Sequence, residues 1–257
     1  MRDGLAALNL LGIVSAVLDA IARVPSLLAF EGGAVHSPLT PLAYTFSIPS
    51  GLLALLLFFP LFLLGLFAAA AYIELIAQGV RPLSEDSKSA VLVRISLLWF
   101  RLIGLSLILF GLLMASLFVL MLAQIFAPAG TDAGSFFAAL ALVGWFWISI
   151  YFFFAISGMA VGQVGLLESL RRSVFILRIY FWPSILLIGL TVVVERGLGL
   201  IWSGLTVTPL GVPVGILANA FIGTSLLAAS MVYYQDRMNA IQRLVAQARA
   251  AATRRNL

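Results

Sequence analysis

The sequence predicts an all-α polytopic membrane protein with six transmembrane helices, and three observations carry this prediction. First, 63% of the 257 residues are hydrophobic and only 10% are charged, whereas about 25% of residues are charged in soluble domains. Second, the apolar segments exceed the roughly 20 residues that a helix needs to cross the hydrocarbon core, and they lack the short alternating pattern of a transmembrane β-barrel. Third, the basic residues concentrate in every second connector between these segments.

Six apolar segments are the predicted spans, at about residues 5–30, 51–77, 99–126, 136–161, 181–202 and 214–234. The first is expected to be retained, because Asp19 and Arg23 interrupt it and no small-x-small cleavage site precedes polar sequence. Residues 1–235 are therefore expected to form one six-helix domain. Residues 236–257 form an Arg- and Ala-rich tail, whose composition fits either a helix or a disordered end.

Two basic connectors are predicted to be amphipathic helices on the inner face of the membrane, at residues 84–98 and 165–178. In the second, an apolar stripe has the three-and-four spacing of a helix, and the charged residues fall off it. The stripe consists of Leu166, Leu167, Leu170, Val174 and Leu177. Each connector leads through aromatic residues into an apolar run, and this shared order suggests an internal duplication of span, inner helix and span.

The basic residues also predict the orientation of the chain. Placing the amino terminus, residues 78–101, residues 162–180 and the tail on the inner side puts 13 of the 15 Lys and Arg there, and leaves only Arg23 and Arg196 outside. Basic residues near span ends favour the cytoplasmic side. We therefore expect a multi-pass protein of the cytoplasmic (inner) membrane with both termini in the cytoplasm.

Four charged residues fall in the outer third of two predicted spans: Asp19, Arg23, Glu195 and Arg196. At a rise of about 1.5 Å per residue, Asp19 and Glu195 lie at the same depth, roughly 21 Å above the start of their spans. Isolated charges at that depth are costly, and these four sum to zero. We expect them to form a structural ion-pair cluster; a substrate or proton site is the alternative.

Five arginines in the two inner connectors are candidate contacts with anionic lipid headgroups: Arg94, Arg101, Arg171, Arg172 and Arg178. Each basic residue near a charged surface contributes about 1 kcal/mol to binding, although topology alone would also explain their position. We interpret Glu74 and Arg101 as interface anchors at span ends. The small-xxx-small element from Gly158 to Gly162 predicts close helix packing within the bundle.

The stretch from Gly165 to Leu190 resembles a motif of a bacterial and archaeal group of six-span membrane domains. The group includes the membrane domain fused to some glycerophosphodiester phosphodiesterases and related domains of unknown function. Its inner helix has an acid, Ala or Ser, Leu, any residue, Arg and Ser, and a Phe-Trp pair then precedes a span. The matching residues are Glu168, Ser169, Leu170, Arg172, Ser173, Phe181 and Trp182. The resemblance implies a six-span fold and no enzyme activity, because this chain lacks the phosphodiesterase domain.

Chemistry-bearing motifs do not stand out in the sequence. There is no Cys and one His, and no phosphate-binding loop, nucleophile elbow or zinc-protease motif occurs. We therefore expect no catalytic residues, cofactor or metal, and a non-enzymatic accessory, scaffold or assembly factor that contacts lipid headgroups or a membrane-protein partner. The alternative is a small transporter or lipid-handling protein with a cavity between duplicated halves. Nucleic acid is not an expected partner, because the basic residues are interleaved with spans.

The predicted topology is tested by reporter fusions. A reporter fused after Asp132 should report the outer compartment, and one fused after Leu257 should report the cytoplasm, because 13 of 15 basic residues then lie inside. A fusion within residues 162–165 serves as a second cytoplasmic control. The same compartment for Asp132 and Leu257 would rule out this topology.

Overall fold

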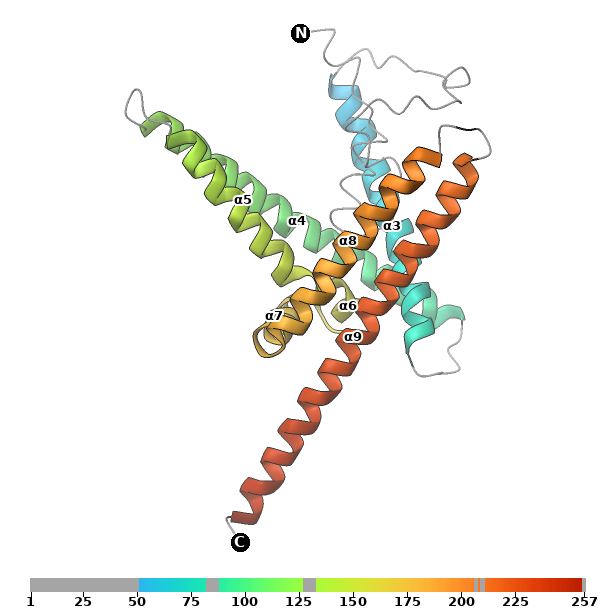
Figure 1. The fold of residues 1–257 in the computed structure, drawn as a ribbon, viewed down its shortest axis with the longest axis vertical. Helices are drawn as coiled ribbons and strands as arrows, with labels where there is room; N and C mark the ends of the chain where they lie inside the picture. Colours follow the sequence, from blue (N-terminus) through green and yellow to red (C-terminus); the bar gives the residue numbers. More distant parts are fainter. Residues whose placement is uncertain (1–50, 82–87, 127–132, 206–207, 209–210, 256–257) are drawn as a thin grey trace. The chain divides into compact units, whose positions relative to one another are not determined.

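The structure is a computed structural model that describes residues 51–81, 88–126, 133–205, 208 and 211–255. Within these ranges the regular secondary structure is entirely helical (Figure 1). The helices are α3 (Gly51–Val80), α4 (Lys88–Phe126), α5 (Ala133–Phe152), α6 (Ala155–Ala160), α7 (Leu166–Ile179), α8 (Phe181–Leu205) and α9 (Gly211–Arg255). The first predicted span, residues 5–30, lies outside the described residues.

Five stretches are long and apolar enough to cross a membrane: Leu56–Val80, Ala90–Leu122, Phe136–Ala160, Phe181–Leu198 and Gly211–Ala248. They coincide with the second to sixth predicted spans. Much of their apolar surface is exposed, as at Leu186 and Phe221, which is the arrangement expected where lipid is the solvent. The coarse prediction, an all-α, multi-pass membrane protein, is confirmed for the described residues.

The first inner connector differs from its prediction. Helix α4 is continuous over 39 residues, so residues 88–98 are the beginning of the helix that forms the third predicted span and do not form a separate surface helix. No Gly or Pro occurs between Lys88 and Ile103, and nothing in the local sequence interrupts the backbone hydrogen bonds. Residues 84–87 lie outside the described part of the chain.

The second inner connector is a separate helix, as predicted. Helix α7 ends at Ile179 and α8 begins at Phe181, with Tyr180 between them at φ −113° and ψ 47°. Pro183 explains the break, because a proline has no N–H to donate to the carbonyl of residue 179 and its ring would clash with that carbonyl in a continuous helix. In the first turn of α8 the same proline is tolerated. The two connectors therefore have different structures, which counts against a simple internal duplication.

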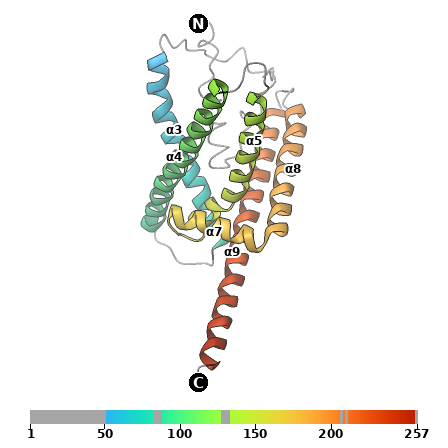
Figure 2. The same ribbon diagram turned by 90° about the vertical axis from the view of Figure 1, so that its left-hand side faces the viewer.

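Helix α9 includes both the last predicted span and most of the tail. Its 45 residues correspond to about 68 Å at 1.5 Å per residue, which is more than twice the roughly 30 Å hydrocarbon core. Residues 242–248 are all exposed, and the end of α9 extends away from the other elements of its unit (Figure 2). Of the two alternatives for the tail, the helix is confirmed as far as Arg255.

The chain divides into two compact units. The first comprises Met1–Leu102 and Gly189–Ala229, and the second comprises Ile103–Ile188 and Ser230–Leu257. In the first unit, Trp99 of α4 donates a hydrogen bond from Nε1 to the Leu63 carbonyl of α3 at 3.1 Å. The hydroxyls of Tyr72 on α3 and Thr224 on α9 are 2.7 Å apart. These polar contacts between helices supplement an apolar interface around Leu66, Ile73 and Leu98.

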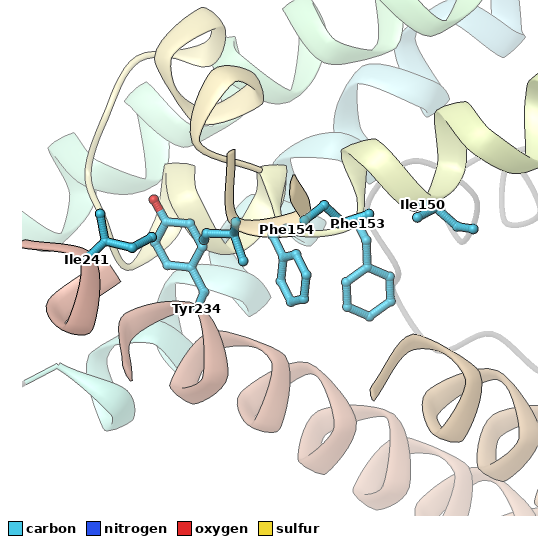
Figure 3. Close-up of a cluster of buried hydrophobic side chains, with 7 residues drawn as sticks. Ile150, Phe153, Phe154, Tyr234 and Ile241 are labelled. Atoms are coloured by element: carbon cyan, nitrogen blue, oxygen red, sulfur yellow. The ribbon is translucent and has the colours of Figure 1, made fainter. Parts of the chain in front are cut away.

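The second unit has its core where α5, α7 and α9 meet. Seven buried side chains form this core: Ile150, Phe153, Phe154, Ile176, Leu177, Tyr234 and Ile241 (Figure 3). The Phe154 ring stacks on Tyr233 of α9 with centroids 5.4 Å apart. Helix α7 packs on α5 and α6 and runs crosswise to α5, at the end where α5 finishes (Figure 2).

The predicted fourth span, residues 136–161, is interrupted. Helix α5 ends at Phe152 and α6 begins at Ala155, with neither Gly nor Pro between them. At the interruption Phe153 donates its N–H to the Ile150 carbonyl, three residues back, at 3.1 Å. The carbonyl that a continuous helix would offer to residue 154 is thereby used by residue 153. Residues 136–160 remain an apolar stretch long enough to cross a membrane, but the helix within it is broken at Phe153 and Phe154, where a side chain of α7 contacts the backbone.

Close packing at the glycine pair 158 and 162 is confirmed. A Cβ on Gly158 would overlap the Ser169 Oγ of α7 and would lie 3.1 Å from the Tyr234 hydroxyl of α9. A Cβ on Gly162 would lie 2.7 Å from the Gly158 carbonyl oxygen. Only residues without a side chain allow α6, α7 and α9 to approach so closely.

Replacing Gly158 should therefore destabilise the protein. We expect Gly158→Ala to lower the unfolding free energy in detergent by about 1 to 3 kcal/mol, because the added methyl overpacks a filled interface. Gly144→Ala on α5 is the matched control, since nothing lies within 4 Å of its Cβ position. That change should be neutral or stabilising by up to about 1 kcal/mol. Equal unfolding temperatures for the two variants would contradict this packing.

Candidate functional site

Helix α7 carries three of the five arginines proposed to contact lipid, so its two faces define the candidate site. Its buried face consists of Ser169, Ser173, Ile176 and Leu177. The predicted apolar stripe is therefore only partly right: Leu177 is buried, but Leu167 is 71% exposed. The inward face is centred on two serines spaced one turn apart.

The two serines explain the interruption between α5 and α6. Ser173 Oγ accepts a hydrogen bond from the Phe154 N–H at 3.2 Å and donates one to the Tyr151 carbonyl at 2.6 Å. Ser169 Oγ donates to the Ala155 carbonyl. The side chains of α7 thus replace backbone partners that are lost where the helix is broken. A break inside an apolar segment requires such partners, because lipid supplies none.

The opposite face of α7 mixes basic and bulky apolar side chains. Arg171 and Arg178 are exposed, and so are Leu167, Phe175 and Ile179. Arg172 lies at the edge of this face, where its Nε donates to Glu168 Oε1 at 2.8 Å. This hydrogen bond raises the pKa of the Arg172 guanidinium. The side chain is partly exposed, and such an i,i+4 pair contributes at most a few tenths of a kcal/mol to stability.

The other predicted site residues lie elsewhere. Arg94 and Arg101 are half-buried in α4, within the first unit. Glu195 and Arg196 are neighbours in α8, also in the first unit, with Glu195 half-buried and Arg196 exposed. Asp19 and Arg23 lie outside the described residues, so the predicted four-charge cluster stays a prediction.

A buried ion pair was not anticipated from the sequence. Glu74 is 1% exposed. Its carboxylate accepts two hydrogen bonds from Arg81, one from Nη1 to Oε1 and one from Nη2 to Oε2, and each is 2.8 Å long. The interpretation of Glu74 as an interface anchor is wrong, because its carboxylate is enclosed by protein. The seven-residue spacing was the available signal, since it places both side chains on one helix face two turns apart.

Among the described residues, no group of three or more His, Cys, Asp or Glu side chains is close enough together to hold a metal ion. Comparison of the chain with protein-family models, with curated proteins and with solved structures finds no match. The resemblance to six-span membrane domains therefore stays a prediction. The site is described by its geometry: a mixed basic and apolar face on α7, backed by serines that complete a broken helix.

Removing the Ser173 hydroxyl should destabilise the second unit and loosen the helix break. We expect Ser173→Ala to cost about 2 to 4 kcal/mol, because it leaves the Phe154 N–H and the Tyr151 carbonyl without a partner. Amide exchange at residues 153–155, measured by mass spectrometry in detergent, should become faster.

Ser149→Ala is the matched control for this change. Ser149 is exposed and its hydroxyl donates only to the Trp145 carbonyl of its own helix, at 2.9 Å, so its loss should change stability by less than about 0.5 kcal/mol. Unchanged exchange at residues 153–155 in Ser173→Ala would show that the serine does not hold the break.

Proposed function

We propose that this chain is a non-enzymatic accessory or scaffold protein of the cytoplasmic (inner) membrane, and that α7 is its contact with anionic lipid headgroups. The single observation that supports this most strongly is the exposed face of α7. Arginines on one helix face alternate there with large apolar side chains, which is the composition of a helix lying at the boundary between headgroups and acyl chains. Both termini are cytoplasmic in this proposal, following the distribution of basic residues.

Aromatic residues near α7 also support a position at the boundary between headgroups and acyl chains. Trp182, in the first turn of α8, is 72% exposed, and Trp147 of α5 stacks with Phe181 at 6.4 Å between ring centres. Aromatic side chains gather at the membrane interface because they combine an apolar body with a polar edge. The arginines of α7 would then reach lipid phosphates while Leu167, Phe175 and Ile179 enter the acyl region.

Buried polar groups favour an accessory role over transport. Glu74 is neutralised by Arg81, the residue directly after α3, and the α7 serines are engaged with backbone groups of α5, of α6 and of Phe154 between them. Each of these groups already has a structural partner. A transport pathway would instead need polar groups that become available to a substrate.

The proposal is tested by removing the two exposed charges of α7. The double variant Arg171→Gln and Arg178→Gln should bind phosphatidylglycerol about 2 kcal/mol more weakly than the wild type, at about 1 kcal/mol per residue. Native mass spectrometry of the full chain in detergent, titrated with phosphatidylglycerol or phosphatidylcholine, measures this difference. The preference for phosphatidylglycerol should also shrink as salt increases.

The charge-conserving double variant, with lysine at both positions, is the matched control and should keep most of the binding. In cells, the glutamine variant should reproduce the phenotype of a deletion, and the lysine variant should complement it. A wild-type chain that binds the two lipids equally would overturn the proposal.

A further inference from the structure

Arg237 of α9 is held between aromatic rings in the second unit. Its Cζ lies 4.9 Å from the ring centre of Tyr180, the residue that separates α7 from α8, and 4.9 Å from that of Tyr233, one turn earlier on α9. A guanidinium at this distance is attracted by the negative face of an aromatic ring. The side chain is 31% exposed, so the aromatic contacts leave part of it open.

The aromatic partners are themselves fixed. The Tyr233 hydroxyl is 3.1 Å from the hydroxyl of Ser184, a fully buried residue of α8, and the Tyr233 ring stacks on Phe154. Tyr180 is held by its N–H, which donates to the Ile176 carbonyl at 2.8 Å. The Arg237 guanidinium is therefore positioned by one ring from the α7–α8 junction and one from α9 itself, before any ligand arrives.

The N–H donors of Arg237, unlike the face of its guanidinium, are not all matched by a partner. Its ion pair with the neighbouring Asp236 is long, with Oδ2 at 3.8 Å from Nη1, which is beyond hydrogen-bond distance. Arg237 Nε is buried and has no hydrogen-bond partner. Because Nε is enclosed, a ligand can reach only the part of the guanidinium that is exposed, which belongs to a side chain that is 31% exposed; an anionic oxygen there would accept charge-assisted hydrogen bonds.

We infer that Arg237 is a binding site for a phosphate-bearing anion, supplied by the headgroup of an anionic membrane lipid. The planar guanidinium offers parallel N–H donors that match two oxygens of one phosphate. Along α9 the sequence changes at this point from apolar residues through Tyr233 and Tyr234 to Gln235 and Asp236, as expected where a helix leaves the hydrocarbon core. The inference rests on the proposed function, because it places α7 and this part of α9 at the inner headgroup layer.

The site is tested on the full chain in detergent by native mass spectrometry. Arg237→Gln should weaken phosphatidylglycerol binding about tenfold, the effect of losing one charge-assisted hydrogen-bonded contact. Arg237→Lys should restore it only in part, because an ammonium group keeps the charge without the planar pair of donors. Tyr180→Leu should also weaken binding, since it removes one of the two rings that position the guanidinium.

Arg243→Gln is the matched control, because Arg243 is exposed on the same helix, and it should bind like the wild type. Far-UV circular dichroism identifies any variant that fails to fold, and a folded Arg237→Lys then carries the test. Phosphatidylcholine and inorganic phosphate are titrated in parallel. Binding of inorganic phosphate that depends on Arg237 would support the phosphate site but assign it to a soluble ligand.

Two outcomes separate this inference from the proposed function. If Arg237→Gln binds phosphatidylglycerol as the wild type does, or if Arg243→Gln loses as much, the Arg237 site is wrong while the role of α7 stands. If the wild type shows no preference for the anionic lipid, the proposed function itself is wrong.

Discussion

The hydrogen bonds from Ser169 and Ser173 to the broken backbone between α5 and α6 are the constraint on which the second unit depends. They join α7 to the ends of α5 and α6, and the Phe154 N–H and Tyr151 carbonyl at the break need such a partner because an apolar environment supplies none. Because the serines lie one turn apart on one face, they also fix the rotation of α7 about its axis. That rotation decides which residues of α7 are exposed, and so it turns Arg171 and Arg178 outward.

Charged side chains that are wholly or partly buried are accommodated in two ways in this protein. Glu74 is paired with Arg81, the residue directly after its own helix, so the ion pair links no two helices. Arg237 is positioned by rings from the α7–α8 junction and from α9, and its side chain stays partly exposed. The Glu74 carboxylate, matched by both Nη groups of Arg81, is a structural feature, whereas a positioned and partly exposed cation is suited to binding.

Proline content explains why the two inner connectors fold differently. Pro183 ends the helix that contains the arginines of α7, and a separate crosswise helix results. The residues before Ile103 contain no such interruption, and α4 therefore continues through Arg94 and Arg101. Similar composition and similar spacing of basic residues thus give different structures, because a single missing N–H decides whether the helix can continue.

The sequence alone determined the helical class, five long apolar helices that could cross a membrane, the break before Pro183 and the close packing at Gly158, because each follows from composition or from a residue with a local backbone effect. Only the tertiary structure decided the interruption at Phe153, since its cause, Ser173, is 20 residues further along the chain and leaves no local signal. The same holds for the inward serine face of α7. The leucines of α7 are more hydrophobic than its serines. The backbone groups at the helix break nevertheless require hydrogen-bond partners, and in an apolar interior that requirement outweighs the burial of another leucine.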